Sequence, residues 1–322
     1  MSIVRKMSNK IVILTGGTGG HIFPAQALAK ELSNNGFKVT ILANKNYPKF
    51  HSDNKYQYKV ISSAYLRENI SILLFPMKIL YGFCQSFFWL LFHNPKKIIS
   101  FGSYATFPPL IAAVLLQKTI IIHEQNSVMG KVNKLFVKYA KYIVTSYPNT
   151  SGIAAEYLDK VIQTGNPIRQ DILALKNHPF KLPVFLQEYD KKLSNEYFDN
   201  NIHKFNILIL GGSGGANIFG EKIVQSFSLL KKDLISKLSI THQCHKDILR
   251  QVNNSYNNHQ INAKLAPFFS DIKTEIKKSH LIISRSGSSS ISEFSFAKKP
   301  MILVPFAKAS ENHQLKNAQH IK

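Results

Sequence analysis

Two stretches of the chain share one pattern of apolar and polar residues. Segments 11–32 and 206–224 each begin with a continuous apolar run, pass through a glycine-rich turn and continue with apolar residues at helical spacing. A short uninterrupted apolar run is typical of a strand buried on both faces of a parallel sheet. A helix directly after such a strand begins a β-α-β unit, so the pattern predicts two α/β domains of similar size.

Further apolar runs alternate with helical stretches in both halves. The runs are 38–43, 96–101, 119–124 and 141–146 in the first half, and 237–243, 280–286 and 300–306 in the second. This alternation predicts a doubly wound parallel sheet in each domain. We place the boundary near the segment 164–170, which gives domains 1–165 and 166–322. The polar stretch 176–205 is expected to be a surface insertion or loop before the first strand of the second domain.

The segment 70–92 is apolar enough to require separate treatment. Its length matches a membrane span, but polar residues interrupt it and it lies between strands of the first domain. At helical spacing the polar face carries Lys78, Gly82, Gln85 and Ser86, and the apolar face carries Phe75, Phe83, Phe87, Trp89 and Leu90. Three interpretations stay open: a core helix, a helix whose apolar face docks on a membrane, and a transmembrane helix.

Composition narrows the function classes. The chain of 322 residues is 44% hydrophobic, which is ample for two cores. Its formal charge of +23 comes almost entirely from scattered lysines. Base-reading proteins cluster arginines, so we expect no nucleic-acid partner. The lysines are either a solvated compositional bias or an attraction to an anionic membrane surface or a diphosphate substrate.

The two cysteines and the first residues favour a cytoplasmic protein. Cys84 and Cys244 have no spacing typical of a metal site or a redox motif, which fits a reducing cytosol. The apolar run that follows the basic start is too short for a signal peptide.

The loop GGTGGH at 16–21 is the first candidate for chemistry. It is not a dinucleotide fingerprint, because Ile22 stands where the third glycine belongs and no acidic residue ends the next strand. It is not a P-loop either, since no Lys-Ser or Lys-Thr pair follows. Glycines here let the backbone approach a ligand, and His21 lies at the start of the helix, where the positive helix end favours a neutral imidazole.

Two more segments carry polar groups at strand ends. The run 284–294 follows an apolar strand and supplies serine hydroxyls and backbone amides at a predicted helix start, which suits a phosphate. Glu293 lies one to two turns into that helix, within reach of sugar hydroxyls. The segment HEQN at 123–126 ends a strand of the first domain, and its amide side chains can both donate to and accept from sugar hydroxyls.

Taken in order, these segments resemble the MurG family of bacterial peptidoglycan synthesis. The matching segments are GGTGGHIFPAQALAKEL (16–32), FGSYATFPP (101–109), HEQNSVMGKVNK (123–134), TGNPIR (164–169), GGSGGANIFG (211–220), SRSGSSSISEF (284–294) and PMILVPF with ENHQLKNA (300–306 and 311–318). Seven segments in one order form a very specific resemblance.

The resemblance implies a GT-B fold, in which two Rossmann-like domains with parallel sheets face a central cleft. It implies transfer of N-acetylglucosamine (GlcNAc) from UDP-GlcNAc to the C4 hydroxyl of the muramoyl sugar of lipid I, the undecaprenyl-linked acceptor. The product is lipid II, formed with inversion at the cytoplasmic face of the membrane by a peripheral protein. No cofactor and no bound metal are expected, because helix ends and glycine loops can stabilise the departing diphosphate.

Site residues carry over from the resemblance motif by motif. His21 corresponds to the general base, and Thr18, Gly19 and Gly20 line the cleft. The remaining residues implied to bind UDP-GlcNAc are Asn126 for the sugar hydroxyls, Arg169 and Ser213 for the diphosphate, Phe269 for uracil through its backbone, Ser288, Ser289, Ser290, Ile291 and Ser292 at the helix start, Glu293 for the ribose and Gln314 for the donor sugar.

The sequence departs from the family pattern at five places. In the family's GGYxSGP loop the second glycine is Ser103 and the SGP is Phe107-Pro108-Pro109, and the GGSxGA loop carries Gly214 at its variable position. The acid before the His-Gln pair is Glu311 with Asn312 inserted, and the chain ends at Lys322, soon after this motif. The second domain is therefore expected to be shortened at its C-terminus. Two alternatives to the lipid II reaction stay open: another GT-B enzyme that uses a UDP-sugar, such as a lipid glucosyltransferase or an epimerase, and an inactive UDP-GlcNAc-binding homologue at the membrane.

Overall fold

A computed structural model describes residues 9–45, 47, 55–63, 74–189, 193–212, 219–307 and 309–321. The chain divides into two compact units, Met1–Arg169 with Gln319–Lys322, and Gln170–Ala318.

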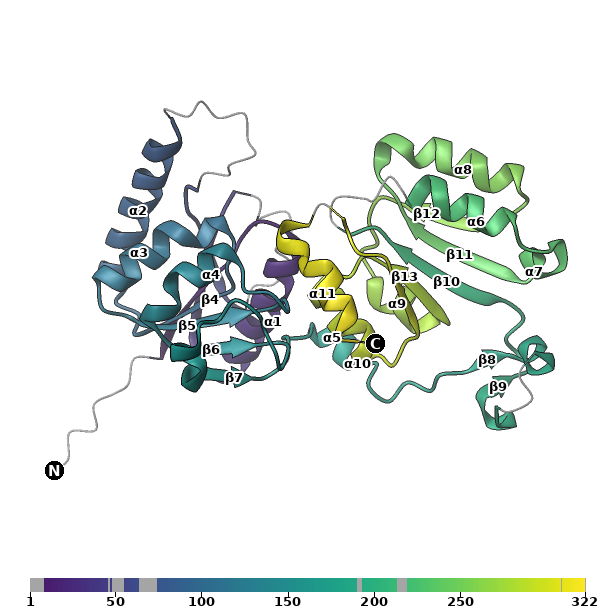
Figure 1. The fold of residues 1–322 in the computed structure, drawn as a ribbon, viewed down its shortest axis with the longest axis horizontal. Coiled ribbons are helices and arrows are strands. Elements are labelled where there is room, and N and C mark those ends of the chain that lie inside the picture. The colour runs from purple at the N-terminus through teal and green to yellow at the C-terminus, as the bar shows by residue number, and fades with distance from the viewer. Residues whose placement is uncertain are drawn as a thin grey trace. The chain divides into compact units, whose positions relative to one another are not determined.

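The described residues of the first unit form a seven-stranded parallel sheet (Figure 1). Its strands are β1 (Lys10–Leu14), β2 (Lys38–Ala43), β3 (Gln57–Val60), β4 (Lys97–Ser100), β5 (Thr119–Glu124), β6 (Ala140–Thr145) and β7 (Val161–Gln163), and their order is β3-β2-β1-β4-β5-β6-β7. The connecting helices are α1 (Gly19–Asn34), α2 (Leu74–His93), α3 (Phe107–Leu115) and α4 (Lys131–Phe136), with 3₁₀ turns at Tyr104–Thr106, Val137–Tyr139 and Ala155–Lys160. The parallel sheet predicted for this half is confirmed, with strand ends shifted by a few residues.

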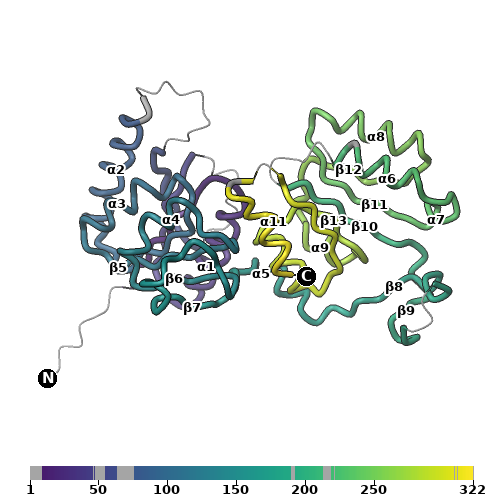
Figure 2. Tube along the Cα trace, in the orientation of Figure 1, coloured from purple at the N-terminus to yellow at the C-terminus, as the bar shows by residue number. Residues whose placement is uncertain are grey.

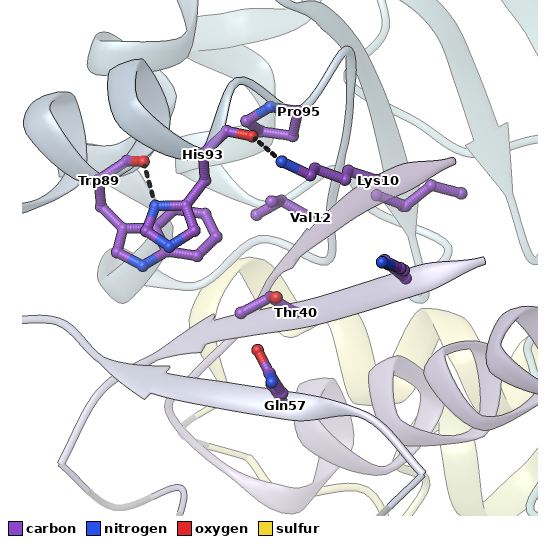
Figure 3. A pocket seen from close by; sticks show the side chains of 9 residues that line it. Lys10, Val12, Thr40, Gln57, Trp89, His93 and Pro95 are labelled. Carbon is purple, nitrogen blue, oxygen red and sulfur yellow. Dashed lines mark hydrogen bonds between the residues drawn. The ribbon is translucent and has the colours of Figure 1, made fainter. Parts of the chain in front are cut away.

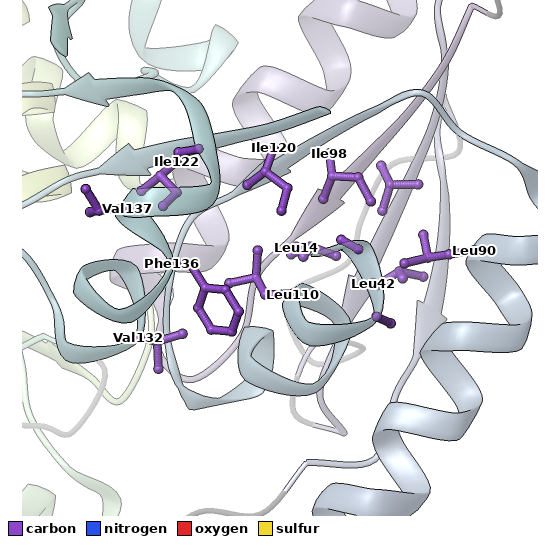
Figure 4. Packing of buried hydrophobic residues seen from close by; sticks show 14 of the residues in the cluster. Leu14, Leu42, Leu90, Ile98, Leu110, Ile120, Ile122, Val132, Phe136 and Val137 are labelled. Carbon is purple, nitrogen blue, oxygen red and sulfur yellow. The ribbon is translucent and has the colours of Figure 1, made fainter. Parts of the chain in front are cut away.

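Alternate residues of the central strand pack into two different clusters. Val12 and Leu14 of β1 face α2, α3 and α4, while Ile11 and Ile13 face α1. This alternation follows from the two-residue period of a strand. Figure 4 shows the first of these clusters, in which Leu14 packs with side chains of the helices. Those labelled include Leu90 of α2, Leu110 of α3 and Phe136 of α4.

The helix α2 buries part of its polar face. Gly82 and Ser86 are buried, and the Gln85 carboxamide oxygen accepts a hydrogen bond from the Ser62 backbone amide at 2.9 Å. A Cβ at Gly82 would lie 2.0 Å from the Ser62 carbonyl oxygen, so only glycine permits this approach. The predicted polar face is thus turned inward.

The predicted apolar face of α2 also packs inward. Leu90 is buried, and Phe83, Phe87 and Trp89 pack against the same core cluster. The side chain of Phe75 lies outside the described residues. The exposed face is also apolar, and its side chains are Met77, Leu80, Tyr81, Phe88, Leu91 and Phe92. Backbone approach and one hydrogen bond, and not polarity alone, therefore select the buried residues of this helix.

The described residues of the second unit contain a five-stranded parallel sheet. Its strands are β10 (Phe205–Leu210), β11 (Leu238–Gln243), β12 (Ala263–Ala266), β13 (Leu281–Ser284) and β14 (Met301–Leu303), in the order β12-β11-β10-β13-β14. The helices are α5 (Gln170–Leu173), α6 (Val224–Ser228) after a π-helical turn at Phe219–Ile223, α7 (Lys232–Ser236), α8 (Leu249–Asn258), α9 (Ile272–Lys278), α10 (Ser288–Phe296) and α11 (His313–Gln319), with 3₁₀ turns at Lys246–Ile248 and Ser310–Asn312. Figure 2 follows the path of this unit from β10, in teal, to α11, in yellow.

The polar stretch 176–205 is not only a loop in its described part. It holds two short parallel strands, β8 (Leu182–Pro183) and β9 (Phe198–Asp199), and 3₁₀ turns at Val184–Glu188 and Asn195–Tyr197. A two-residue strand leaves no periodic pattern in a sequence, so the sequence indicated an insertion or loop here but not this ladder.

Candidate functional site

Loops from three neighbouring strands meet at the carboxyl edge of the first sheet. The strand β1 pairs with β2 on one side and with β4 on the other, and β4 pairs with β5. The order therefore reverses at β1 and β4, and ligands of open α/β sheets bind beside such a switch point. The loop 15–18 follows β1, the loop 101–103 follows β4, and residues 125–130 follow β5.

The glycine loop after β1 is pressed against the loop after β4. A Cβ on Gly16 would lie 2.5 Å from the Ala105 Cβ, which no side chain tolerates. Gly17 has φ +79°, and a Cβ there would lie 3.1 Å from the Ser103 hydroxyl oxygen. These glycines therefore allow the contact between two loops, in addition to any contact with a ligand.

His21 stands where the three loops converge. It is the third residue of α1, and its backbone carbonyl accepts a hydrogen bond from the Thr15 hydroxyl at 2.9 Å. The Nδ1 atom of its partly buried ring lies 2.9 Å from the Phe101 carbonyl oxygen and 2.8 Å from the Gln125 Oε1. The loops after β4 and β5 thus both orient one imidazole that β1 and α1 position.

His123 and Gln125 form a buried layer behind His21. His123 is 3% exposed, and its ring stacks on that of Phe101 with centroids 4.7 Å apart. Burial lowers the pKa of His123 to about 4, so its imidazole is neutral near pH 7. The Gln125 amide nitrogen lies 2.9 Å from the His123 carbonyl oxygen and 3.1 Å from the His123 Nδ1.

A buried carboxylate holds the loop that carries Asn126. Glu124 is 1% exposed, and its Oε1 accepts hydrogen bonds from the Asn126 backbone amide at 3.0 Å and from the Asn126 side chain at 3.3 Å. Its Oε2 accepts from the Gly130 amide at 2.9 Å and from the Asn133 Nδ2 at 2.8 Å. Glu124 therefore fixes the position of Asn126, a role that the sequence analysis did not assign.

The other predicted residues of the first unit lie around this edge. Thr18 and Gly20 are exposed at the start of α1, whereas Gly19 is buried. The Arg169 guanidinium lies over the Phe23 ring, 5.0 Å from its centroid, which places Arg169 beside the same helix. Ser213 lies outside the described residues.

In the second unit the predicted residues gather at the end of β13. The helix α10 begins at Ser288. Its N-cap residue is Gly287, so no side chain caps the first backbone amides of the helix. Ser288 is buried, and its carbonyl accepts a hydrogen bond from the Ser292 hydroxyl at 3.0 Å, while Ser289 and Ser290 are partly exposed. The start of α10 therefore presents serine side chains at the switch point between β10 and β13.

Gln314 is tied to the same edge by its backbone and its side chain. Its carbonyl accepts a hydrogen bond from the Ser286 hydroxyl at 2.7 Å, and its Oε1 accepts one from the Phe306 amide at 2.9 Å. Asn317 donates to the Ser286 carbonyl at 3.1 Å, which anchors α11 beside β13.

Three predicted donor-site residues have buried side chains. Ile291 is 1% exposed and Phe269 is 9% exposed, so each can offer a ligand little besides its backbone. Glu293 is 8% exposed on α10. The neighbour of Phe269, Phe268, is 64% exposed instead.

The sequence indicated loops that the structure brings together at one edge of the sheet, but not the roles of three residues that organise them. Gln125 contacts His21, Glu124 braces Asn126, and the Phe101 carbonyl faces the His21 ring. The only available signal was their position at strand ends, since carboxyl ends of neighbouring parallel strands meet at one edge.

A separate cavity of about 110 Å³ lies at the opposite end of the first sheet (Figure 3). Lys10 and Lys38, the first residues of β1 and β2, line it together with Trp89 and His93 of α2. The Lys10 ammonium donates to the His93 carbonyl at 3.0 Å, and the Trp89 and His93 rings stack with centroids 4.0 Å apart. This cavity lies at the amino ends of the strands, away from the loops around His21.

Within the described ranges, no group of three His, Cys, Asp or Glu side chains is arranged to hold a metal ion. No helix among the described residues is long and apolar enough to cross a membrane.

Comparison with known proteins identifies the family. Residues 11–145 match the glycosyltransferase family 28 N-terminal domain, and residues 206–322 match the glycosyltransferase family 28 C-terminal domain. A protein of Rhodospirillum centenum is 34% identical over 314 residues, which cover 97% of this chain and 78% of that protein. A protein of Rickettsia bellii is 35% identical over 312 residues, which cover 96% of this chain and 82% of that protein.

Both relatives are named UDP-N-acetylglucosamine–N-acetylmuramyl-(pentapeptide) pyrophosphoryl-undecaprenol N-acetylglucosamine transferase. The crystal structure of Acinetobacter baumannii MurG superimposes with a TM-score of 0.69 at 26% identity, covering 97% of this chain and 82% of that one. The chain belongs to the MurG family. The predicted resemblance and the predicted GT-B fold class with its two parallel sheets are confirmed.

Structures outside the MurG family share the fold at lower identity. UDP-GlcNAc 2-epimerase from Neisseria meningitidis, solved with UDP-GlcNAc, superimposes with a TM-score of 0.59 at 15% identity, over 96% of this chain and 89% of that one. This likeness shows the fold alone. As a member of the MurG family and of glycosyltransferase family 28, the chain is a UDP-GlcNAc-dependent glycosyltransferase.

Proposed function

We propose that this MurG-family protein transfers GlcNAc from UDP-GlcNAc to the C4 hydroxyl of the muramoyl sugar of lipid I, and so makes lipid II. The names of its relatives contain the same donor, the same N-acetylmuramyl-(pentapeptide) pyrophosphoryl-undecaprenol acceptor and the same transferred group. Each relative is matched over nearly the whole length of this chain, which supports the same reaction here.

The observation that carries the mechanism is the placement of His21 at the switch point of the first sheet. Its Nδ1 is engaged by the Phe101 carbonyl and the Gln125 carboxamide, which leaves Nε2 as the ring atom for substrate. In the proposed step the acceptor O4 attacks the anomeric carbon of GlcNAc, the bond from that carbon to the diphosphate breaks, and His21 Nε2 takes the hydroxyl proton. Because attack and departure occur on opposite faces, the configuration inverts.

The departing UDP needs stabilisation of its diphosphate. In our proposal the first turn of α10 supplies it, through backbone amides and the Ser288–Ser290 hydroxyls at the positive helix end. Arg169 and Ser213 contribute to the same group, Glu293 binds the ribose hydroxyls, and Phe269 contacts uracil through its backbone. Asn126 and Gln314 bind the GlcNAc, and Thr18, Gly19 and Gly20 line the cleft between donor and acceptor.

The test is a transfer assay with UDP-GlcNAc and a lipid I analogue. We expect His21→Ala to lower kcat by roughly 10²–10⁴-fold, the usual contribution of a positioned general base, with little change in donor affinity. Glu293→Ala should instead weaken UDP-GlcNAc binding through loss of a ribose contact. Activity should persist with a chelator, since helix amides and side chains hold the diphosphate.

Other outcomes would select the open alternatives. UDP-GlcNAc binding without turnover on any acceptor would favour an inactive homologue, and turnover of UDP-GlcNAc alone would favour hydrolysis or epimerisation. If His21→Ala lost donor affinity but kept its maximal rate, His21 would be a binding residue and the proposed base would be wrong.

We also propose that α2 docks the protein on the anionic cytoplasmic face of the cell membrane. Phe92 is 78% exposed, Met77 65%, and Leu80 and Tyr81 61% each. Together these side chains form an apolar patch on one helix, which is more than the isolated exposed apolar residues of an ordinary surface. Exposed Lys131 and Lys134 lie on α4, which covers the same side of the sheet as α2. An apolar face beside lysines suits an interface with anionic headgroups.

Vesicle binding tests this docking, and Trp89, the single tryptophan of the chain, lies on α2 as a fluorescence probe. Burying one of these side chains is worth about 1.5 kcal/mol, so Leu80→Asp and Phe92→Asp should each weaken partitioning at least tenfold. The matched control is Leu229→Asp, which replaces a side chain that is 86% exposed in the second unit. Equal loss in all three variants, or no binding to phosphatidylglycerol vesicles at low salt, would contradict the proposal.

A further inference from the structure

The donor and acceptor of each hydrogen bond behind His21 follow from the chemistry of the two groups that it joins. The Gln125 carboxamide has an oxygen that accepts and an NH₂ that donates, and its partners fix which of the two points toward His21. One end lies 2.9 Å from the His123 carbonyl oxygen, which can only accept, so this end is the NH₂ donor. The other end, Oε1, therefore faces the His21 Nδ1 at 2.8 Å.

The His21 Nδ1 consequently faces two acceptors. One is Gln125 Oε1 and the other is the Phe101 carbonyl oxygen, at 2.9 Å. Only a protonated nitrogen is favourable between two oxygens, so Nδ1 carries the hydrogen. In a neutral imidazole the lone pair is then on Nε2.

The next histidine of the network has its direction fixed in the same way. The Gln125 NH₂ also lies 3.1 Å from the His123 Nδ1, which must accept from it. The hydrogen of the neutral His123 ring is then on Nε2, which donates to the Gly165 carbonyl at 3.3 Å. Burial lowers the His123 pKa to about 4, so this ring stays neutral and keeps its acceptor at neutral pH.

We propose that Gln125 is a positioning residue that fixes the tautomer of His21, so that the Nε2 lone pair is available for the acceptor hydroxyl. This inference rests on the proposed role of His21 as general base. Gln125 is a neutral counterpart of the carboxylate that orients the base in many hydrolases. It is held by His123, and through His123 by Gly165 at the end of the first unit, so the side chain cannot rotate without breaking buried hydrogen bonds.

Nitrogen NMR of the wild-type protein gives the first measurement. With ¹⁵N-labelled histidine, long-range proton–nitrogen spectra distinguish a protonated ring nitrogen from one with a lone pair. The chain has 12 histidines, and His21→Gln identifies the signal of His21 by its loss. We expect a protonated Nδ1 and an unprotonated Nε2 at neutral pH. A protonated Nε2 in the folded wild type would overturn the inference without any variant.

Substitution of Gln125 gives the second measurement. Gln125→Met keeps the length of the side chain and removes both hydrogen-bonding ends. The His21 shifts should move toward a mixture of tautomers, and kcat should fall by roughly 10- to 100-fold with the KM for UDP-GlcNAc unchanged. This loss is smaller than the ~10⁴-fold effect of a fully wrong tautomer, because the Phe101 carbonyl remains.

Two further variants separate positioning from structure. Gln125→Glu retains an acceptor for His21 Nδ1 but replaces the NH₂ that donates to the His123 carbonyl by an oxygen. We therefore expect it to retain the wild-type tautomer of His21 and to lower the free energy of unfolding. Gln26→Met is the matched control, because Gln26 lies on the same helix as His21 but bonds to Tyr47, and its spectrum and kcat should equal those of the wild type.

The outcomes distinguish this inference from the proposed function. Unchanged His21 shifts in Gln125→Met would overturn the positioning role, whatever the activity. Altered shifts with an unchanged kcat would support the fixed geometry but overturn His21 as the base, and with it the catalytic value of Gln125. Altered shifts together with reduced kcat would support both.

Discussion

Ser103 should limit the stability of the first unit, and replacing it by glycine should stabilise the protein. Its backbone has φ +81° and ψ 153°, a combination that residues other than glycine rarely adopt. The resembling family motif has glycine at this place. Ser103 lies in the loop after β4, which packs against Gly17 in the loop after β1. We attribute the strained conformation of Ser103 to this contact between the two loops.

Three contributions set the magnitude of Ser103→Gly. Release of the strained backbone contributes about 1–3 kcal/mol. Loss of the hydroxyl that accepts from the Ala105 amide, at 3.3 Å, costs about 0.5 kcal/mol at this long distance. The greater freedom of glycine in the unfolded chain costs about 0.4–1 kcal/mol. The expected net gain is about 1 kcal/mol, or roughly 2–4 °C in the unfolding temperature of a domain of this size.

Ser103→Ala is the matched control, because it removes the hydroxyl but keeps the strain. It should be about 0.5 kcal/mol less stable than the wild type. Urea unfolding followed by Trp89 fluorescence measures the first unit alone, since the chain has no other tryptophan. If the glycine variant were no more stable than the alanine variant, the backbone at Ser103 would not be strained and the reasoning would be refuted.

Two further predictions concern buried ionisable groups. Burial lowers the pKa of His123 and of His242 from 6.5 to about 4, so between these pH values the unfolded chain binds protons that the folded chain does not. The free energy of unfolding should therefore fall as the pH drops from 6.5 to 4, by up to about 1.4 kcal/mol per pH unit for each histidine, and His242→Phe should reduce the slope measured by denaturant titration at fixed pH. Glu124→Leu leaves the Asn126 and Gly130 amides without their acceptor, so the free energy of unfolding in urea should fall by about 2–4 kcal/mol. Because Asn126 then loses its fixed position, the KM for UDP-GlcNAc should rise. An unchanged KM would remove Asn126 from the donor site.

The sequence by itself determined the central strands and the order of the motifs. Strands such as β1 and β10 are buried on both faces, so they must be continuous apolar runs, and such runs are visible without a structure. The edge strands β3 and β7 of the first sheet give no such signal, since all four residues of β3 and most of β7 are exposed. The edge strand β14 of the second sheet is partly buried, and its apolar run was visible in the sequence.

Only the tertiary structure decided which face of α2 is buried. Its polar residues turned inward because Gly82 admits the Ser62 carbonyl and Gln85 accepts from the Ser62 amide, a contact between segments about twenty residues apart. The site around His21 likewise depends on contacts between residues that are far apart in the sequence. The sequence indicated His21, but its partner Gln125 lies 104 positions away. The periodicity of apolar residues indicates which face of a helix or strand is buried. Which strand ends lie next to each other depends on the order of strands in the sheet, and no local sequence pattern contains that order.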